Sequence, residues 1–469
     1  MLFPTLGFGL FFLAVYSLAW LLRGSNEWRK IVLLIASWIF YGAWDWRFVL
    51  LLIASGFFNW GVGRLIGLAG DDERRRKLLV CLGVALNLAV LAWFKYYNFF
   101  MEQAEALLRS LGWERDLALM QVILPVGISF FTFQGMSYII DVYRRQTRVA
   151  GLLDMTLLMS FFPHLVAGPI VRASHLVPQF RSVPEISRGM AAMGLLLIVW
   201  GLFKKAVIAS ELATRFVDPV FFDPAAYSSL DLVLAAYGYA VQIYCDFSAY
   251  SDMAIGLAAL LGYRFPHNFN QPYRARSLQD FWRRWHISLS SWLRDYLYIP
   301  LGGSRHGLAR LCLALMTTML LGGLWHGANW TFVIWGALHG GVLAAERLWR
   351  DFRPEGWPKL PPLLGIILTF HLVTLSWIFF RSASFGDAIA YLGGIAGGDW
   401  TTTILTPLGL VLILAGMSLH YLPRDGTQRL AVRVRTMPAA LVGLAAGLAI
   451  LVIDAMRPEG VAPFIYYQF

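Results

Sequence analysis

The stretch that decides the fold class is residues 78–95, LLVCLGVALNLAVLAWFK, which directly follows the charged run ERRRK at residues 73–77. It carries a single charged side chain, Lys95, at its very end. A helix needs about 20 apolar residues to cross the hydrocarbon core of a bilayer. The run therefore predicts a membrane helix, and the basic residues beside it predict the end that faces the cytoplasm.

Similar apolar runs recur along all 469 residues. Hydrophobic residues make up 58% of the chain and charged residues 14%, which leaves too few charges to cover a water-facing surface. This composition excludes a soluble enzyme, a disordered chain and a disulfide-stapled secreted domain. A membrane β-barrel would need short alternating strands, and the runs are long and continuous instead. We expect an all-α polytopic membrane protein.

The hydropathy pattern gives about a dozen membrane-embedded segments. They are 5–22, 31–45, 47–67, 78–95, 119–140, 151–170, 189–210, 229–262, 308–324, 329–347, 363–380, 405–420 and 438–455. Segment 229–262 is so long that we expect it to be broken or double. With no linker and no detectable repeat, the chain is interpreted as a single membrane domain, residues 1–469, whose first segment is a retained span and not a signal peptide.

The net charge of +11 has a simple explanation in such a protein. Lys and Arg gather in cytoplasmic loops of membrane proteins, so nucleic acid is not an expected partner. Basic clusters follow the first span, the third span and Tyr143, and a fourth precedes the last span. Their members are Arg23, Arg29 and Lys30; Arg74, Arg75, Arg76 and Lys77; Arg144, Arg145 and Arg148; and Arg424, Arg429, Arg433 and Arg435. The alternation places both termini outside.

Residues 263–307 form an unusual stretch, too polar to span a membrane and too aromatic for a solvated loop. Ser277 with Asp280 three residues later resembles a capping box, so we expect a helix to start there. This interfacial or half-buried helix would place a row of apolar side chains on one face: Trp285, Leu289, Trp292 and Tyr296. Asp280 would pair with Arg284, one turn later.

The arginines of this helix have two interpretations. Arg283 and Arg284 either contact lipid headgroups or form a rim that attracts an anionic acyl donor, such as a phosphate of coenzyme A. The residues alone do not decide between them.

Two of the nine histidines are candidates for proton transfer, which an imidazole performs near neutral pH. His326 lies in LWHGANW, residues 324–330, and His286 lies in the expected capped helix, so the two come from separate elements and can converge. The alternative for each is a hydrogen-bonded core histidine. If one helix joined His326 to His339, the two would be about 20 Å apart and could not serve one atom. No spacing of histidines, cysteines or carboxylates predicts a metal site.

Two carboxylates, Asp246 and Asp252, are expected at the broken centre of segment 229–262. Intramembrane carboxylates are functional by default. The alternative is a helix cap or an ion pair with an arginine of residues 274–284.

Three long blocks carry a family resemblance: QIYCDFSAYSDMAIG (242–256), NFNQPYRARSLQDFWRRWHISLSSWLRDYLYIPLGG (268–303) and LGGLWHGANWTFVIWGALHG (321–340). Residues 37–48, 124–144 and 161–172 match as well. The chain resembles the membrane-bound O-acyltransferase family, in its bacterial alginate O-acetyltransferase branch. The resemblance implies a ring of helices around a central tunnel. It also implies catalytic roles for His326 and His286, with Trp325 and Asn329 as candidate supporting residues.

The resemblance also implies an activity. Members of this branch pass an acetyl group from a cytoplasmic donor, here expected to be acetyl-CoA, across the inner membrane to an extracytoplasmic polysaccharide such as alginate or cellulose. Periplasmic acetyltransferases are the expected partners, and no bound cofactor is expected. A non-catalytic polysaccharide exporter or channel is the alternative, and it would need no titratable histidine pair.

The last six residues, FIYYQF (464–469), follow Ala462-Pro463 and are too apolar to remain in water. They are expected either to anchor the chain at the membrane interface or to enter a cavity. The tail resembles a C-terminal Phe-Ile-Tyr-x-x-Phe signature associated with acyl relay in bacterial members of the family. By this resemblance Tyr466 is a candidate acyl carrier, with Tyr467 as the alternative.

Overall fold

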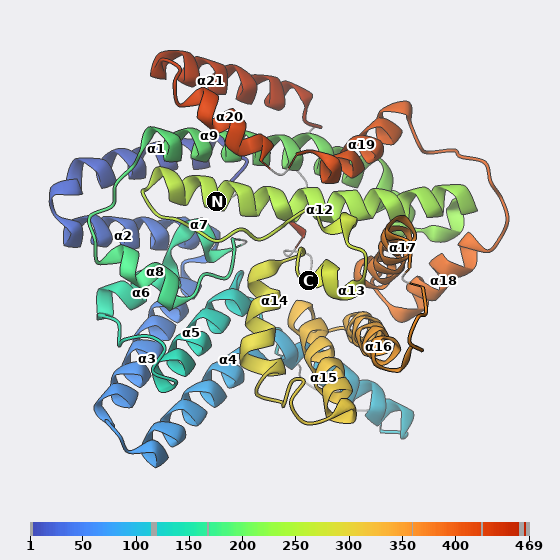
Figure 1. Ribbon diagram of the computed structural model, residues 1–469, viewed down its shortest axis with the longest axis horizontal. Coiled ribbons are helices and arrows are strands. Elements are labelled where there is room, and N and C mark those ends of the chain that lie inside the picture. Colours follow the sequence, from blue (N-terminus) through green and yellow to red (C-terminus); the bar gives the residue numbers. More distant parts are fainter. Residues whose placement is uncertain are drawn as a thin grey trace. The chain divides into compact units, whose positions relative to one another are not determined.

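The computed structural model describes residues 3–113, 120–166, 168–358, 360–423, 425–458 and 464–465. All regular structure in these residues is helical, and they contain no strand. The prediction of an all-α fold is therefore confirmed. The chain forms two compact units: residues 1–187 with 257–265, and residues 188–256 with 266–469. Figure 1 labels the helices, and each unit is described in turn.

The first unit is built around a buried helix. Its helices are α1 (Leu6–Leu21), α2 (Asn26–Asp45), α3 (Arg47–Leu68), α4 (Glu73–Ser110), α5 (Ile128–Tyr143), α6 (Leu152–Ser160), α7 (Phe162–Leu165) and α8 (Ala173–Phe180). Every side chain of α5 from Ile128 to Ile139 is buried, and α5 contacts α3 and α4. Asn59 of α3 and Asn87 of α4 exchange side-chain amide hydrogen bonds, which tie these two apolar helices together.

The helices are shorter or longer than the hydropathy runs predicted. Segment 119–140 becomes helical only at Ile128, and segment 151–170 is interrupted at Phe161, between α6 and α7. In contrast, α4 extends from Glu73 to Ser110, well beyond both ends of the apolar run. Charged side chains at a helix end do not stop the helix, so the hydropathy run marks only the part that lipid can cover.

Two of the expected basic clusters, the one after the third span and the one after Tyr143, meet in the first unit. Arg145, after α5, donates to Asp71, between α3 and α4, with 2.6 Å between the nitrogen and the oxygen. Lys30, in the first turns of α2, pairs with Asp154 at the start of α6, at 2.8 Å. A shared side is what the positive-inside pattern predicts for these loops.

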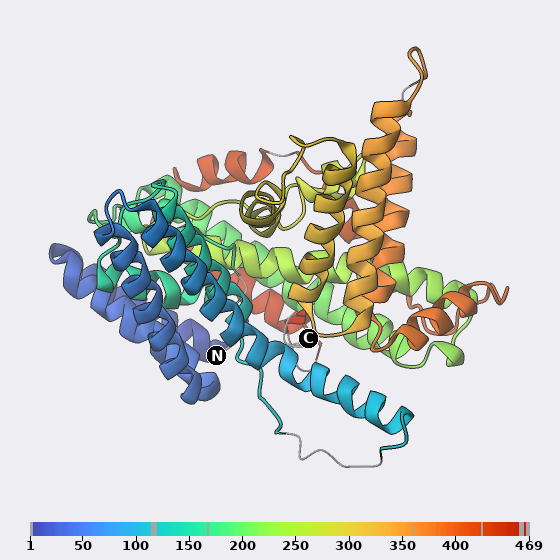
Figure 2. The same cartoon turned by 90° about the horizontal axis from the view of Figure 1, so that it is seen from below.

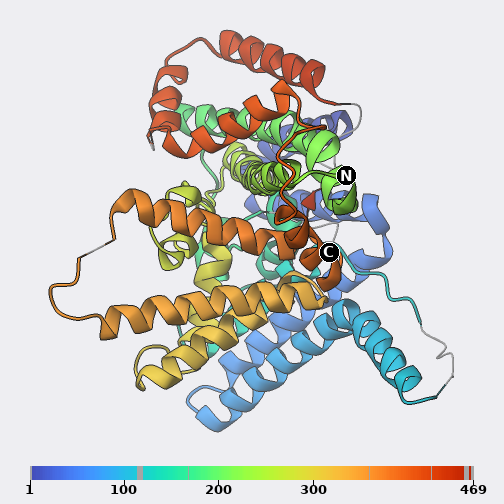
Figure 3. The same cartoon turned by 90° about the vertical axis from the view of Figure 1, so that its right-hand side faces the viewer.

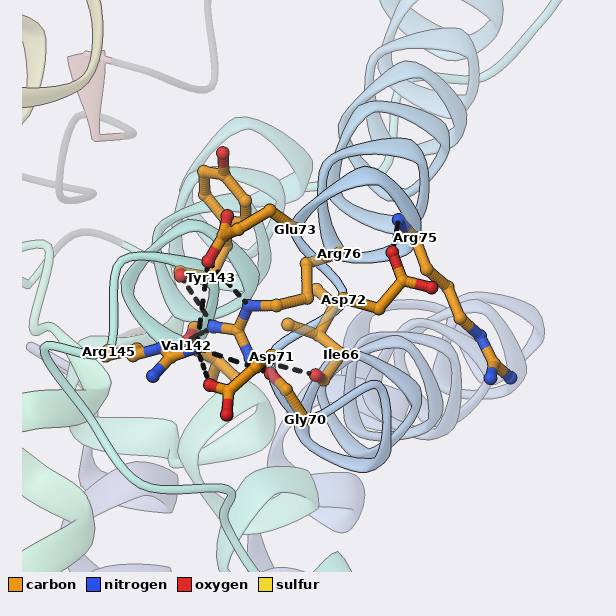
Figure 4. A network of polar contacts seen from close by, with 10 residues as sticks. All are labelled: Ile66, Gly70, Asp71, Asp72, Glu73, Arg75, Arg76, Val142, Tyr143 and Arg145. Carbon is orange, nitrogen blue, oxygen red and sulfur yellow. Dashed lines mark hydrogen bonds and ion pairs between the residues drawn. The ribbon is translucent and has the colours of Figure 1, made fainter.

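Arg76 connects the ends of three helices (Figure 4). Its buried guanidinium donates to the carbonyl oxygens of Ile66 and Gly70 at the end of α3, and to those of Val142 and Tyr143 at the end of α5, at distances of 2.7–3.2 Å. The last carbonyls of a helix have no partner within the helix. One side chain therefore satisfies orphan acceptors from two helices while belonging to a third.

An Arg76→Leu variant is expected to destabilise the protein by about 3 kcal/mol, because buried carbonyls lose a charged donor. Its unfolding midpoint in detergent, followed by intrinsic fluorescence, should fall by roughly 5 °C or more. Arg75→Leu is the matched control, since Arg75 is exposed and points away from the network. Equal midpoints for the two variants would contradict this role for Arg76.

The second unit holds the remaining helices. They are α9 (Arg188–Phe203), α10 (Ser210–Leu212), α11 (Asp218–Phe222), α12 (Ser229–Leu260, shared with the first unit), α13 (Leu278–Trp282), α14 (Ile287–Leu293), α15 (Leu308–His326), α16 (Trp330–Phe352), α17 (Pro362–Arg381), α18 (Phe385–Ile395), α19 (Pro407–Ser418), α20 (Gly426–Val434) and α21 (Ala439–Met456). π-Helical turns at Lys204–Ala209 and Ala213–Val217 connect α9, α10 and α11, and another, Arg294–Tyr298, continues α14.

The expectation that segment 229–262 is broken was wrong. α12 is one continuous helix of 32 residues and contains no proline. It packs closely on α9: a Cβ on Gly201 would lie 2.8 Å from the carbonyl oxygen of Ala249. Its carboxylates pair with lysines of the π-helical turn after α9, so they need no helix break to satisfy them. Asp246 and Asp252 thus lie within an intact helix.

α15 and α16 form a tight hairpin, and α16 runs beside α17 (Figure 2). The hairpin depends on glycines at the contact. A Cβ on Gly336 would lie 2.4 Å from the carbonyl oxygen of Met319, and a Cβ on Gly323 would also collide with the facing helix. Small residues that let helix backbones approach are the usual device of helix packing in membranes.

Seven helical segments of the described residues are long and apolar enough to cross a membrane. They are Leu6–Gly24, Arg47–Leu68, Glu73–Ser110, Arg188–Phe222, Leu308–His326, Pro362–Arg381 and Ala439–Met456. The last is α21, which with α20 packs on α9 (Figure 3). Most α21 side chains, including Leu444 and Leu451, are exposed, as expected for a helix that faces lipid.

Candidate functional site

The segment that carries His286 is two short helices and not one. Ser277 caps α13 as expected, accepting from the Asp280 N–H at 3.1 Å, and Asp280 pairs with Arg284 at 2.8 Å. However, α13 ends at Trp282, and α14 starts only after His286. The prediction of one continuous helix, with His286 in its third turn, was wrong.

His286 occupies a left-handed backbone conformation, with φ at +42°. Such a conformation is unusual for a residue other than glycine, and strained residues of this kind concentrate at functional sites. The surroundings hold it there: Asn268 accepts from the Ile287 N–H through its carbonyl oxygen at 2.9 Å, and from the Ser288 N–H through its side-chain oxygen at 3.2 Å. A residue 18 positions earlier therefore caps α14 in place of a local cap.

Asn268 also determines which ring nitrogen of His286 carries a proton. The side-chain oxygen of Asn268 faces Nδ1 at 3.2 Å, and it already accepts from the backbone N–H of Ser288, so this atom is an oxygen and not a nitrogen. Its side-chain nitrogen donates to the Ser251 hydroxyl at 3.0 Å, which agrees with this orientation. Since this oxygen can only accept, its contact with Nδ1 favours the tautomer in which Nδ1 donates to Asn268 and Nε2 keeps its lone pair, although the Ser288 hydroxyl also lies 3.4 Å from Nδ1.

The His286 ring is completely buried. Among the described residues, Nε2 has no hydrogen-bond partner. Burial lowers the pKa of the His286 imidazole to about 3, so the ring is neutral at physiological pH. A buried neutral imidazole with one nitrogen held and the other open can accept a hydrogen bond or a proton from a bound molecule.

His326 ends α15 and is also buried. Aromatic rings surround it: the ring centroids of Trp325, Trp335 and Phe380 each lie 5.1 Å from its own. The chain turns sharply after His326, and the turn requires a glycine. A Cβ on Gly327 would lie 2.1 Å from the Phe332 ring. The turn and the rings keep this imidazole in an apolar environment.

Trp325 contacts both candidate histidines. Its ring centroid is 6.2 Å from that of His286 and 5.1 Å from that of His326. Both histidines thus border one indole, although they come from different helices. The two histidines therefore converge, as their positions in separate elements of the sequence allowed.

His339 is a core histidine. Trp282 Nε1 donates to its Nδ1 at 3.2 Å, and its Nε2 lies 2.8 Å from the Ser376 hydroxyl, which itself donates to a backbone carbonyl. His339 is close to His326 because both contact Trp335, one on each arm of the hairpin. The separation of about 20 Å assumed a single helix, which the turn at Gly327 rules out.

Asp246 and Asp252 pair with lysines that the sequence interpretation overlooked. Lys205 lies 2.9 Å from Asp246, and Lys204 lies 2.8 Å from Asp252. Neither carboxylate pairs with an arginine of residues 274–284. A signal was present, because Lys204 and Lys205 interrupt the apolar segment 189–210, and charges inside a membrane segment are functional by default. Their π-helical turn is a second mark of such sites.

The other candidate residues take different positions. Asn329 caps α16 by accepting from the Thr331 N–H at 3.0 Å, and it donates to the Ala383 carbonyl. It therefore holds the turn after His326. Arg284 is neutralised by Asp280, whereas Arg283 is exposed. Tyr466 and Tyr467 lie outside the described residues.

The described residues contain no group of three or more histidines, cysteines or carboxylates that could hold a metal ion. The two buried imidazoles can transfer protons and form hydrogen bonds in an apolar enclosure. Such a site suits a reaction in which a hydroxyl loses a proton as it attacks.

The model of the membrane-bound O-acyltransferase family matches residues 86–385, which include both histidines and all three sequence blocks. The chain belongs to this family. It is therefore a membrane O-acyltransferase that crosses the membrane several times. The family resemblance seen in the sequence is confirmed.

Named relatives agree with this assignment. The chain is 42% identical to the probable alginate O-acetylase AlgI of Azotobacter vinelandii, over 84% of this chain and 78% of that protein. It is 38% identical to the protein of the same name in Pseudomonas putida, over the whole length of both. It is also 37% identical to the peptidoglycan O-acetyltransferase of Helicobacter pylori, over 69% of this chain and 65% of that protein.

Proposed function

We propose that this O-acyltransferase takes an acetyl group from acetyl-CoA on the cytoplasmic side of the inner membrane. It passes the group across that membrane for O-acetylation of an extracytoplasmic polysaccharide such as alginate or cellulose. The observation that carries the proposal is the pair of buried histidines that both border Trp325. The names of the relatives support an acetyl group and a polymer acceptor.

In the proposed reaction, His326 is the general base. The acceptor oxygen attacks the thioester carbonyl while its proton moves to His326, and the carbon–sulfur bond breaks as the tetrahedral intermediate collapses. The proton then passes from His326 to the thiolate, so that a free thiol leaves. General base catalysis of this kind contributes about 10²–10⁴-fold, and positioning in a dry enclosure contributes more.

The proposed role of His286 is that of a hydrogen-bond acceptor. Because Nδ1 is held by Asn268, only Nε2 can meet a substrate, and it carries a lone pair. This arrangement supports a role in orienting a donor N–H or O–H group of the bound substrate. It disfavours an alternative role, stabilisation of developing negative charge, since that requires a hydrogen-bond donor.

A direct experiment tests the proposed activity. Purified protein in detergent or nanodiscs is incubated with acetyl-CoA and an oligosaccharide acceptor, and the free thiol released is measured together with the acetyl ester formed on the protein and on the acceptor. Both should appear in equal amounts. Their absence with acetyl-CoA, combined with activity on another acyl donor, would overturn the proposed donor.

We further propose that the C-terminal tail carries the acetyl group between the membrane site and a periplasmic acetyltransferase partner. The phenol oxygen of Tyr466 would attack the thioester and form a phenyl ester, releasing the thiol. A phenol has a pKa near 10, which makes its ester a more reactive acyl donor than an alkyl ester. The burial of Phe464 and Ile465, just before Tyr466, supports a tail that enters the protein.

A Tyr466→Phe variant is expected to lose at least about tenfold in polymer acetylation while keeping its expression level and unfolding midpoint. The matched variant Tyr467→Phe should keep its activity. Acetyl ester content of the secreted polymer, and the mass of the C-terminal peptide after incubation with acetyl-CoA, are the measurements. Full polymer acetylation by Tyr466→Phe would end the relay proposal.

A further inference from the structure

Both carboxylate oxygens of Asp246 are engaged deep in the second unit. Oδ1 lies 2.9 Å from Lys205 Nζ, and Oδ2 accepts a hydrogen bond from the backbone N–H of Ile465, also at 2.9 Å. The Lys205 and Asp246 side chains are only 1% and 4% exposed. The ion pair thus links α12 to the π-helical turn after α9. It also binds the main chain of Ile465, 219 positions after Asp246.

The C-terminal residues at this point are as buried as any core residue. Phe464 is 0% exposed and Ile465 is 1% exposed. The Phe464 ring packs 4.3 Å from Tyr250 and 5.9 Å from Phe247, measured between ring centroids. The burial agrees with the expectation that the tail enters a cavity.

The contact leads directly to the candidate site. Phe247 follows Asp246 in α12, and its ring stands edge-on to His286 with 4.6 Å between centroids. Phe464 therefore touches a ring that itself touches His286. Any movement of residues 464–465 would change the packing on one wall of that histidine.

A physical reason makes the ion pair suitable for holding a chain segment. Burying a salt bridge removes its hydration, and this cost is offset only when further hydrogen bonds satisfy the remaining lone pairs. The Ile465 N–H provides such a bond. Asp246 contacts the main chain and not the side chain at position 465, so the interaction determines the path of the backbone there.

A neighbouring ion pair offers an internal comparison. Lys204 and Asp252 join the same π-helical turn to the same helix, at 2.8 Å, and Lys204 also donates to the Ser248 hydroxyl at 2.7 Å. Both of these partners are on α12, so a hydroxyl of that helix completes this pair. The pair at Asp246 is completed by the C-terminal segment instead.

We propose that the Lys205–Asp246 ion pair is the docking site of the C-terminal segment. Asp246 is a positioning residue that holds Phe464–Ile465 against Phe247, one ring away from His286. The docking itself is independent of the proposed reaction. Only its consequence, delivery of the tail to the reaction site, rests on the proposed function.

The sharpest test removes the donor and leaves the two helices unchanged. Ile465→Pro has no backbone N–H, whereas the control Ile465→Val keeps it and has a similar side chain. Hydrogen exchange of the full-length protein in detergent, read by mass spectrometry on the C-terminal peptide, reports docking. We expect exchange of that peptide to speed up at least tenfold in Ile465→Pro and to stay at the wild-type rate in Ile465→Val.

A second pair of variants tests the dock from its other side. Lys205→Met with Asp246→Leu removes both charges together, so no charge is left buried alone. Lys204→Met with Asp252→Leu is the matched control. Only the first double variant should release the tail, and Asp246→Asn combined with Lys205→Met, which restores an acceptor oxygen, should slow the exchange again.

The outcomes separate docking from catalysis. Wild-type exchange in Ile465→Pro, or equal release of the tail by both double variants, would overturn the dock, because the second result would mean loosened helix packing. Release of the tail in the expected variants establishes the dock even if acetyl-CoA proves not to be the donor. A lost acetyl transfer with a firmly docked tail would count against the proposed function alone.

Discussion

The His326→Gln variant is expected to lose about 10²–10⁴-fold in acetyl transfer, the usual contribution of a general base. Glutamine fills much of the volume of the imidazole and cannot take a proton near neutral pH. The aromatic cage of Trp335 and Phe380 should therefore stay packed while the chemistry fails. A His326→Ala variant should lose as much activity, and it should also lose stability, because it leaves a cavity.

The measurement is the release of free thiol from acetyl-CoA by purified variants whose unfolding midpoints have been determined. His371→Ala is the control, since His371 is exposed on α17 and bonds Tyr237 and a backbone carbonyl away from the two candidate histidines. The control should keep at least half of the wild-type rate. If His326→Gln stayed within threefold of wild type, the base would have to be another group.

The helical membrane fold could be predicted from the sequence because lipid makes a local demand. Each spanning segment must satisfy its own backbone hydrogen bonds, so a run such as 78–95 predicts a helix independently of the rest of the chain. The same reasoning misjudged segment 229–262. Its length suggested a break, yet α12 is continuous, and Lys204 and Lys205 of another helical segment pair with the carboxylates inside it. Such partners from a distant segment cannot be predicted from the run alone.

The candidate site was predictable in its residue types but not in its geometry. His286 and His326 stood out because an imidazole in an apolar context is costly and has a chemical use. The predicted cap at Ser277 is confirmed. The break before His286 was not predictable, since it depends on Asn268, whose backbone and side-chain oxygens cap α14 from outside the local sequence.

Lys204 and Lys205 show where a local rule would have worked. Two adjacent lysines within an apolar segment carry the same signal as the carboxylates that were singled out. Apolar residues flank the two lysines on both sides, so they do not belong to a basic cytoplasmic loop. The link from Asp246 to Ile465 is different in kind. It joins a side chain to a backbone N–H. Because every residue except proline has this group, the residue type at position 465 could not predict the contact.

The Asn268→Leu variant is expected to lower acetyl transfer by about 10²-fold, approaching the effect of removing a catalytic imidazole. Leucine cannot accept from Nδ1 of His286, so the ring loses both its orientation and the tautomer that leaves Nε2 open. It also removes one of the two acceptors that start α14, the side-chain oxygen that accepts from the Ser288 N–H, while the backbone carbonyl that accepts from the Ile287 N–H remains. A loss of activity alone would therefore not separate positioning from stability.

The Asn268→Asp variant separates them. Aspartate keeps an acceptor for Nδ1 and for the Ser288 N–H, but it places a negative charge against an imidazole whose pKa burial has lowered to about 3. A nearby carboxylate favours the protonated ring and raises that pKa. Protonated Nε2 can no longer accept, so activity should fall on acidification at a higher pH than in the wild type, by at least about one unit. The pH profile of kcat is the measurement, with Ser251→Ala as the control that removes only the Asn268 side-chain amide contact. An acid limb at the same pH in Asn268→Asp and wild type would show that Asn268 does not act on the reaction through His286.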